Sequence, residues 1–161
     1  MIVGISGHQS LEPTSTRWLE KALDTELTQL PISVGVSSLA AGTDQLFAGA
    51  VLEHGWRLSV VIPCHQYERT FSNPDDKQQF WELYGRATER TTLDFAEPSE
   101  DAFLAAGKRI VDMSDLMLFV WNGLPAGGRG GTADIVEYAT VTAIPFVHLN
   151  PVNRTATRSP H

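Results

Sequence analysis

The stretch Leu116-Met-Leu-Phe-Val-Trp121, followed by Ala126-Gly-Gly-Arg-Gly-Gly-Thr132 and Ala-Asp134-Ile-Val-Glu137-Tyr-Ala139, decides the fold. Its unbroken apolar run predicts a buried strand, and the helical spacing of apolar residues after Thr132 predicts a helix. The glycines between them allow a sharp turn that exposes several backbone N–H groups. At a helix N-terminus such a loop is an anion site, because unpaired N–H donors and the helix dipole favour negative charge. The stretch therefore predicts a phosphate-binding loop, or alternatively a tight turn without a ligand.

Apolar runs alternate with helix-patterned segments along the rest of the chain. Strands are predicted at residues 2–6, 33–37, 58–62, 116–120 and 146–149, with a further short strand at 91–93. Helices are predicted at 14–30, 43–54, 76–88, 99–114 and 132–142. This alternation predicts an α/β fold of the Rossmann-like, doubly wound kind: a mainly parallel sheet with helices on both faces. One domain over residues 1–150 accounts for these elements, and residues 151–161 are predicted to be a flexible tail.

The composition of the chain argues against a nucleic-acid partner, an internal disulfide and a membrane span. Residues 1–150 carry 10 basic and 19 acidic residues, a net charge of about −9, which counts against nucleic acid as a partner. The single cysteine, Cys64, permits no internal disulfide, and no apolar run is long enough for a membrane span. We therefore expect a cytoplasmic protein with no membrane partner. The histidines lack metal-ligand spacing, so no metal and no other cofactor is predicted.

Small polar residues follow two earlier strands, at the edge where ligands bind in such sheets. The predicted ligand-binding residues there are Ser6, Gly7 and His8 in the first loop and Ser37, Ser38 and Gly42 in the second. The alternative for His8 is a loop histidine bonded to nearby backbone, and Thr43 and Asp44 are interpreted as helix-capping residues. Residues 63–75 form the longest irregular segment and leave a strand at the same edge, which is typical of a functional loop.

The glycine-rich stretch supplies the remaining candidates. Its predicted phosphate-binding residues are Gly127, Gly128, Arg129, Gly130, Gly131 and Thr132. Asp134 and Glu137, three residues apart on one helix face, are the predicted catalytic carboxylates. Trp121 and Asn122 end the preceding strand and are predicted to wall a base pocket, although Trp121 would equally suit core packing and Arg129 would equally lie in solvent.

The three loops together resemble the SLOG superfamily, which includes the SMF/DprA and LOG proteins. The segment Val36-Ser-Ser-Leu-Ala-Ala-Gly-Thr-Asp44 is similar to the SG-A-GID segment of DprA-type proteins, and Ser6-Gly7-His8 matches a short motif after the first strand. The stretch from Gly127 to Glu137 resembles the glycine-rich loop of LOG-type phosphoribohydrolases, in which a glutamate lies three residues after the threonine.

The resemblance implies a Rossmann-like domain that binds nucleotides or their derivatives, often as a homodimer or higher oligomer. LOG-type enzymes hydrolyse the N-glycosidic bond of nucleoside 5'-monophosphates, with the phosphate on the glycine-rich loop and an acidic residue acting on the ribose. DprA-type proteins bind single-stranded DNA. Three functions therefore remain open: a nucleoside 5'-monophosphate N-glycosidase, a non-catalytic nucleotide sensor that passes its signal to a partner, and, with less support from the acidic composition, a single-stranded DNA binder.

Overall fold

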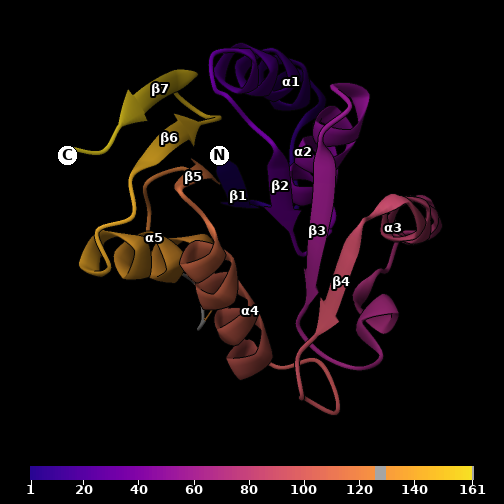
Figure 1. Ribbon diagram of the computed structural model, residues 1–161. Helices are drawn as coiled ribbons and strands as arrows, with labels where there is room; N and C mark the ends of the chain where they lie inside the picture. The colour runs from indigo at the N-terminus through magenta and orange to yellow at the C-terminus, as the bar shows by residue number, and fades with distance from the viewer. Residues whose placement is uncertain (126–129, 161) are drawn as a thin grey trace.

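The computed structural model describes residues 1–125 and 130–160. Within this part of the chain, one sheet has the strand order β4-β3-β2-β1-β5-β6-β7 (Figure 1). The strands are β1 (Ile2–Gly7), β2 (Val34–Ser37), β3 (Arg57–Ile62), β4 (Glu89–Thr92), β5 (Leu116–Val120), β6 (Phe146–Asn150) and β7 (Thr155–Arg158). The helices are α1 (Pro13–Thr28), α2 (Thr43–Glu53), α3 (Pro74–Arg86), α4 (Glu100–Met113) and α5 (Thr132–Val141), with a 3₁₀ turn η1 (Tyr67–Thr70).

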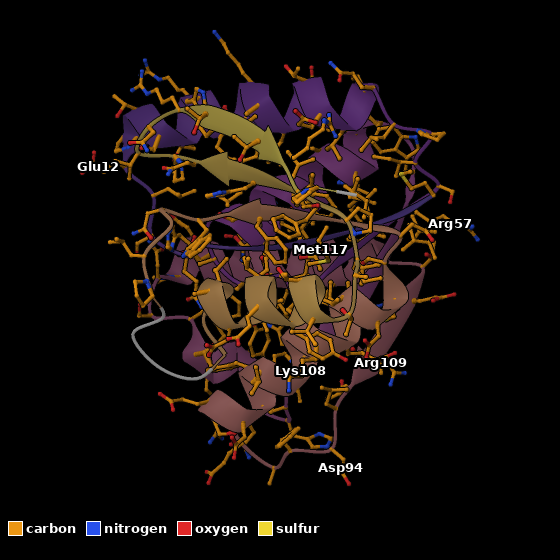
Figure 2. All side chains as sticks on the ribbon, turned by 90° about the vertical axis from the view of Figure 1, so that its left-hand side faces the viewer. Glu12, Arg57, Asp94, Lys108, Arg109 and Met117 are labelled. Carbon is orange, nitrogen blue, oxygen red and sulfur yellow. The ribbon has the colours of Figure 1, made fainter. Side chains whose placement is uncertain are left out.

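The sheet separates two apolar layers, because its central strands are buried on both faces. One layer holds residues of α1 and α2, such as Leu23 and Phe47, packed against Val3 and Ile5 of β1. The other holds residues of α4 and α5, such as Ile110 and Ile135, packed against Met117 and its neighbours on β5. Figure 2 shows α1 above the sheet and α4 and α5 below it. The predicted doubly wound α/β fold is therefore confirmed.

All strand pairs are parallel except the pair of β6 and β7, which is antiparallel. We predicted a flexible tail for residues 151–161, but Thr155–Arg158 form strand β7 at the edge of the sheet. The Arg158 guanidinium also donates to the Glu26 carboxylate on α1 at 2.7 Å. The backbone pairing and this ion pair account for the added strand, although its four side chains are all exposed.

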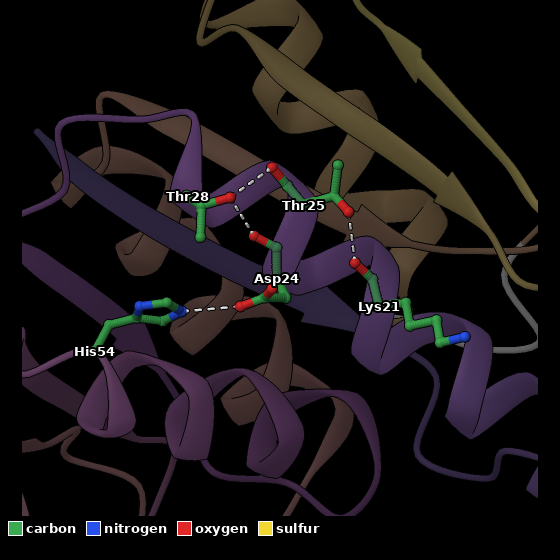
Figure 3. Close-up of polar contacts among 5 residues, drawn as sticks. All are labelled: Lys21, Asp24, Thr25, Thr28 and His54. Atoms are coloured by element: carbon green, nitrogen blue, oxygen red, sulfur yellow. Dashed lines mark hydrogen bonds and ion pairs between the residues drawn. The ribbon is translucent and has the colours of Figure 1, made fainter.

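A polar contact joins α1 and α2 on the outer surface of their layer, and further contacts lie within α1 (Figure 3). The His54 ring, at the end of α2, lies 3.0 Å from the Asp24 carboxylate on α1. Thr25 and Thr28 donate to backbone carbonyls one turn earlier in α1, which occupies their hydroxyls within the helix. No helix in the described part of the chain is both long enough and apolar enough to cross a membrane.

The strand order creates the place where a ligand site is expected. The chain moves outward from β1 to β4 and then returns to β5 on the opposite side of β1. At such a reversal, the loops that leave neighbouring strands diverge to opposite faces and open a crevice at the carboxyl ends of the strands.

Candidate functional site

A cavity of about 660 Å³ lies at this crevice, at the carboxyl ends of β1, β2 and β3. Three loops, the 3₁₀ turn η1, α4 and the first turn of α5 surround it. Its polar and glycine lining consists of Ser6, Gly7, His8, Gln9, Ser10, Ser38, Asp44, Tyr67, Thr70, Ser72, Asp76, Gly107, Gly130, Gly131 and Thr132. The remaining lining is apolar and includes Phe71 and Phe103. The volume is in the range of small-molecule sites.

The β1–α1 loop brings Ser6, Gly7 and His8 to the lining of this cavity, and their role in ligand binding stays a prediction. A Cβ at Gly7 would lie 2.6 Å from Thr43 Cγ2, so the absence of a side chain lets β1 approach α2. His8 Nε2 accepts a hydrogen bond from the Asn122 backbone N–H at 3.1 Å, so the neutral ring carries its proton on Nδ1. Burial lowers the pKa of His8, which favours that neutral form. His8 therefore both lines the cavity and binds nearby backbone.

The β2–α2 loop contributes Ser38 to the lining of the main cavity. The other two residues predicted in this region, Ser37 and Gly42, do not line that cavity. The buried Ser37 hydroxyl accepts from the Leu39 N–H and donates to the Asp44 carbonyl, so it holds the loop together. Gly42 has a φ of +77°, and a Cβ there would lie 2.3 Å from the Gln9 carbonyl oxygen. Gly42 lines a neighbouring cavity of about 460 Å³ instead. Ser37 and Gly42 thus shape the loop, and neither lines the main cavity.

Asp44 is buried, although its sequence position predicts only a helix-capping residue. Only 7% of its surface is exposed, and it lines the main cavity. One carboxyl oxygen, Oδ2, accepts from the Ala40 N–H at 3.2 Å. Burial raises the pKa of the Asp44 carboxyl to about 7, and the hydrogen bond from Ala40 opposes this rise. At neutral pH both the protonated and the ionised form of the Asp44 carboxyl are therefore populated. An aspartate in a first helical turn predicts only favourable dipole contact, so its burial had no signal in the sequence.

Tyr67 faces the same end of the cavity from the turn η1 within the long 63–75 loop. Its ring packs edge-on against Phe71 and Phe80, with centroids 5.6 Å away in each case. The pKa of Tyr67 is well above its ordinary value, first because of burial and then because of the nearby Asp44 carboxyl. Asp44 and Tyr67 therefore lie close enough to influence each other electrostatically, and Phe103 of α4 also packs edge-on against the Tyr67 ring, with centroids 6.5 Å apart.

Thr132, the first residue of α5, and the preceding Gly130 and Gly131 also line the cavity, beside Phe103 and Leu104 of α4. The predicted phosphate-binding residues Gly127, Gly128 and Arg129 lie outside the described residues. No side chain caps α5, and the Asp134 carboxylate instead accepts from the Gly130 N–H at 2.9 Å. This end of the cavity is a helix N-terminus, which favours an anion.

The predicted catalytic carboxylates do not reach the cavity. Asp134 is half-buried and bonded to Gly130, and it is absent from the cavity lining. Glu137 is exposed and lies two residues beyond Ile135, whose side chain faces α4 and the cavity. Two residues along a helix are rotated by about 200°, so Glu137 points away from Ile135. The carboxylates among the described lining residues are instead Asp44 and Asp76.

The predicted base pocket is also placed elsewhere. The Trp121 indole N–H donates to the Leu124 carbonyl at 2.7 Å, and its ring lies against His148 with a centroid distance of 5.1 Å. Asn122 lines a third cavity of about 480 Å³ on the other side of His8. Trp121 and Asn122 thus border the β1–α1 loop without lining the main cavity.

The charge of the main cavity is negative over its described lining. Asp44 and Asp76 contribute carboxyl groups, and no lysine or arginine is present among the described lining residues. Within residues 1–125 and 130–160, no group of three or more histidine, cysteine, aspartate or glutamate residues is arranged to hold a metal ion.

Comparison with solved structures identifies the fold. The chain superimposes on a DprA from Helicobacter pylori, described for its single-stranded DNA binding mode, with a TM-score of 0.68 and 17% identity over 95% of this chain and 70% of that one. It superimposes on the DNA processing protein DprA from Streptococcus pneumoniae with a TM-score of 0.62 and 20% identity over 91% of this chain. The chain therefore shares the Rossmann-like fold of these DprA structures.

The same fold extends to the protein TM1055, which matches 90% of this chain and 71% of its own length with a TM-score of 0.57 and 14% identity. The chain spans about half of the Streptococcus pneumoniae DprA, since 49% of that protein is covered. Sequence comparison finds no matching family and no matching curated protein. The predicted resemblance to DprA is therefore confirmed at the level of the fold.

Proposed function

We propose that this chain binds a nucleotide or a nucleotide-derived molecule in the main cavity, with its phosphate at the N-terminus of α5. The observation that carries the proposal is the shape of the cavity, which joins the carboxyl ends of three parallel strands to the first turn of a helix. Ligands of doubly wound α/β sheets bind at that position, and helix N-termini stabilise phosphate. Ser6, Gly7, His8 and Ser38 would face the ligand between the two ends.

The charge of the lining favours a single phosphate over a long phosphate chain. Gly130, Gly131 and Thr132 offer backbone donors and the helix dipole, whereas the described lining supplies no basic side chain. Gly127, Gly128 and Arg129 belong to the same proposed phosphate loop. Dipole and N–H donors hold one phosphate group well, whereas further phosphates would meet the negative charge of Asp44 and Asp76.

Hydrolysis of the N-glycosidic bond is the enzymatic form of this proposal. A carboxylate that stabilises charge at the anomeric carbon, or that activates water, must lie within hydrogen-bond reach of the ribose. Asp76 lines the cavity and is the candidate for that carboxylate, whereas Asp134 and Glu137 do not line it. Without turnover, the same site serves as a nucleotide sensor, and its occupancy would be signalled to a partner or to a second copy of the chain.

The test is calorimetric titration of the purified protein with nucleoside 5'-monophosphates, with free base followed by chromatography in the same samples. The informative variant is Thr132→Glu, which places a carboxylate where the phosphate is proposed to bind. It should weaken binding at least about 10-fold, since repulsion replaces attraction at the helix N-terminus. Thr140→Glu is the matched control, because Thr140 is exposed on the same helix away from the cavity. Equal affinity of the two variants would place the phosphate elsewhere.

Single-stranded DNA binding is the second candidate, and the fold shared with the Helicobacter pylori DprA favours it. Binding to a DNA backbone depends on lysine and arginine contacts and weakens steeply with salt. A fluorescent oligothymidine titrated at two salt concentrations tests it directly. Salt-dependent binding tighter than that of any monophosphate would make DNA the ligand. Binding of the monophosphates alone would support the small-molecule proposal.

A further inference from the structure

We infer that the Asp44–Tyr67 end of the main cavity binds the nucleobase, and that Asp44 accepts a hydrogen bond from an exocyclic amino group of that base. This inference rests on the proposed nucleotide function and adds the position and chemical class of the base. It replaces the predicted base pocket at Trp121 and Asn122, which the structure places outside the cavity.

Two buried polar groups at this end have unused hydrogen-bonding capacity. Asp44 uses Oδ2 for the Ala40 N–H, and no described residue donates to Oδ1. Tyr67 is 5% exposed, and its hydroxyl has no hydrogen-bond partner among the described residues. Every fully buried side-chain nitrogen or oxygen among the described residues has a hydrogen-bond partner. Because the Tyr67 hydroxyl has none, it is not fully buried, and it faces the cavity that Tyr67 lines. Buried polar groups normally have partners, so an acceptor and a donor left free at a cavity wall indicate a polar ligand.

The surrounding side chains fit a flat aromatic ligand. Tyr67 and Phe71 line the cavity with Pro63, and the two aromatic rings pack edge-on with centroids 5.6 Å apart; Phe103 lies next to both Tyr67 and Gly130, with its Cβ 3.1 Å from where a Cβ on Gly130 would stand. Aromatic and apolar walls bury a base ring by stacking and contact, whereas the glycine and serine groups at the other end suit a phosphate. The two ends therefore fix the orientation of a bound nucleotide, with its base toward η1 and its phosphate toward α5.

Hydrogen-bond chemistry then selects the kind of base. A carboxyl group retains an acceptor oxygen in both its ionised and its protonated form, so Oδ1 can always accept from an amino N–H. An oxo oxygen at the same position is repelled by the ionised carboxylate, whereas the protonated carboxyl can donate to it, so the preference for an amino group should be tested at pH 8, where the ionised form prevails. The Tyr67 hydroxyl can donate to the adjacent ring nitrogen. Acidic side chains recognise the amino group of cytosine in this way.

The decisive experiment compares two pairs of nucleotides that differ in the exocyclic group: CMP with UMP, and AMP with IMP. For whichever pair binds, the amino member should bind at least about 10-fold more tightly, as expected for a hydrogen bond to a charged group. Asp44→Asn should reverse the preference. Its amide oxygen can still accept from the Ala40 N–H, and its NH₂ then donates to an oxo group. Asp76→Asn, which changes the other carboxylate of the lining, should keep the wild-type preference.

The outcomes separate this inference from the proposed function. Tight binding with no preference between amino and oxo members, or a preference that Asp44→Asn leaves unchanged, overturns the base assignment and leaves nucleotide binding intact. Failure of all four nucleotides to bind the wild-type protein removes the proposed function itself. Tyr67→Phe should weaken the binding of both members of a pair while the amino preference persists, because the lost hydroxyl can donate to the ring nitrogen of the amino base and accept from the ring N–H of the oxo base.

Discussion

Replacing Asp44 by asparagine should make the protein more stable at high pH, and the effect should fade as the pH falls. The Asp44 pKa is about 7 in the folded chain, against a value of 3.8 for an unperturbed aspartate. Between these values the folded state binds a proton that the unfolded state has released. Stability contributed by protonated Asp44 is therefore complete below about pH 4 and is lost as the pH rises toward 7.

The size of the effect follows from the shift. Each pKa unit corresponds to about 1.4 kcal/mol, so a change from 3.8 to about 7 amounts to about 4 kcal/mol of lost stability. Asparagine is nearly isosteric, keeps an oxygen for the Ala40 N–H, and never ionises. The free energy of unfolding of the wild-type protein should therefore be a few kcal/mol lower than that of the Asp44→Asn variant at pH 8. At pH 4.5 the two free energies should be close.

Urea denaturation of both proteins at pH 4.5, 6 and 8 measures this difference. The comparison isolates Asp44, because every other titrating group is common to both chains. Asp94→Asn serves as a control, since Asp94 is exposed and should give a difference that varies little over this range. A difference between wild type and Asp44→Asn that stays constant from pH 4.5 to 8 would refute the burial argument, and with it the view of Asp44 as a desolvated group in the cavity.

Three further substitutions test the packing and the charges of the site. Gly7→Ala should destabilise the fold by about 1–3 kcal/mol in urea denaturation, because its Cβ would lie 2.6 Å from Thr43 Cγ2; unchanged stability would contradict the close approach. Asp134→Asn should raise the affinity for a nucleoside monophosphate by about 2- to 5-fold in calorimetry, because it removes a negative charge beside the proposed phosphate; a weaker affinity would argue against that position. Glu137→Gln should change neither nucleotide affinity nor base release, because the side chain is exposed outside the cavity; loss of either would return Glu137 to the site.

The sequence predicted the architecture well, because central strands buried on both faces must be apolar along their length. Its failures lie at the edges of the sheet. All four side chains of β7 are exposed, so Thr155–Arg158 have no apolar pattern to reveal a strand. Strand β4, also wholly exposed, was predicted only as a fragment at residues 91–93. Edge strands are held by backbone pairing to one neighbour, and side-chain patterns do not report that pairing.

The candidate site was only partly predictable for a related reason. Small residues after strands point to the edge of the sheet where the cavity lies, and Ser6, Gly7, His8 and Ser38 line that cavity, while their binding role stays a prediction. Side-chain direction was the unpredictable part. Spacing alone makes Asp134 and Glu137 a pair on one helix face, but it does not say whether that face meets the cavity. For Asp44, the same position in a first helical turn is compatible with an exposed capping residue or a buried acid, and tertiary packing decides between them.

The fold shared with DprA and the charges of this chain give different kinds of information about the ligand. A Rossmann-like sheet determines where loops converge, so the likeness supports a ligand at the carboxyl ends of β1 and β2 whichever ligand it is. The side chains determine what can bind there. A continuous DNA strand would carry phosphates past Asp44 and Asp76, and each would meet negative charge with no described basic residue to offset it. A monophosphate has one charged end, which the N-terminus of α5 can accept, and a neutral aromatic end, which Tyr67, Phe71 and Phe103 can enclose. The polarity of the cavity therefore matches a nucleoside monophosphate better than it matches a nucleic acid.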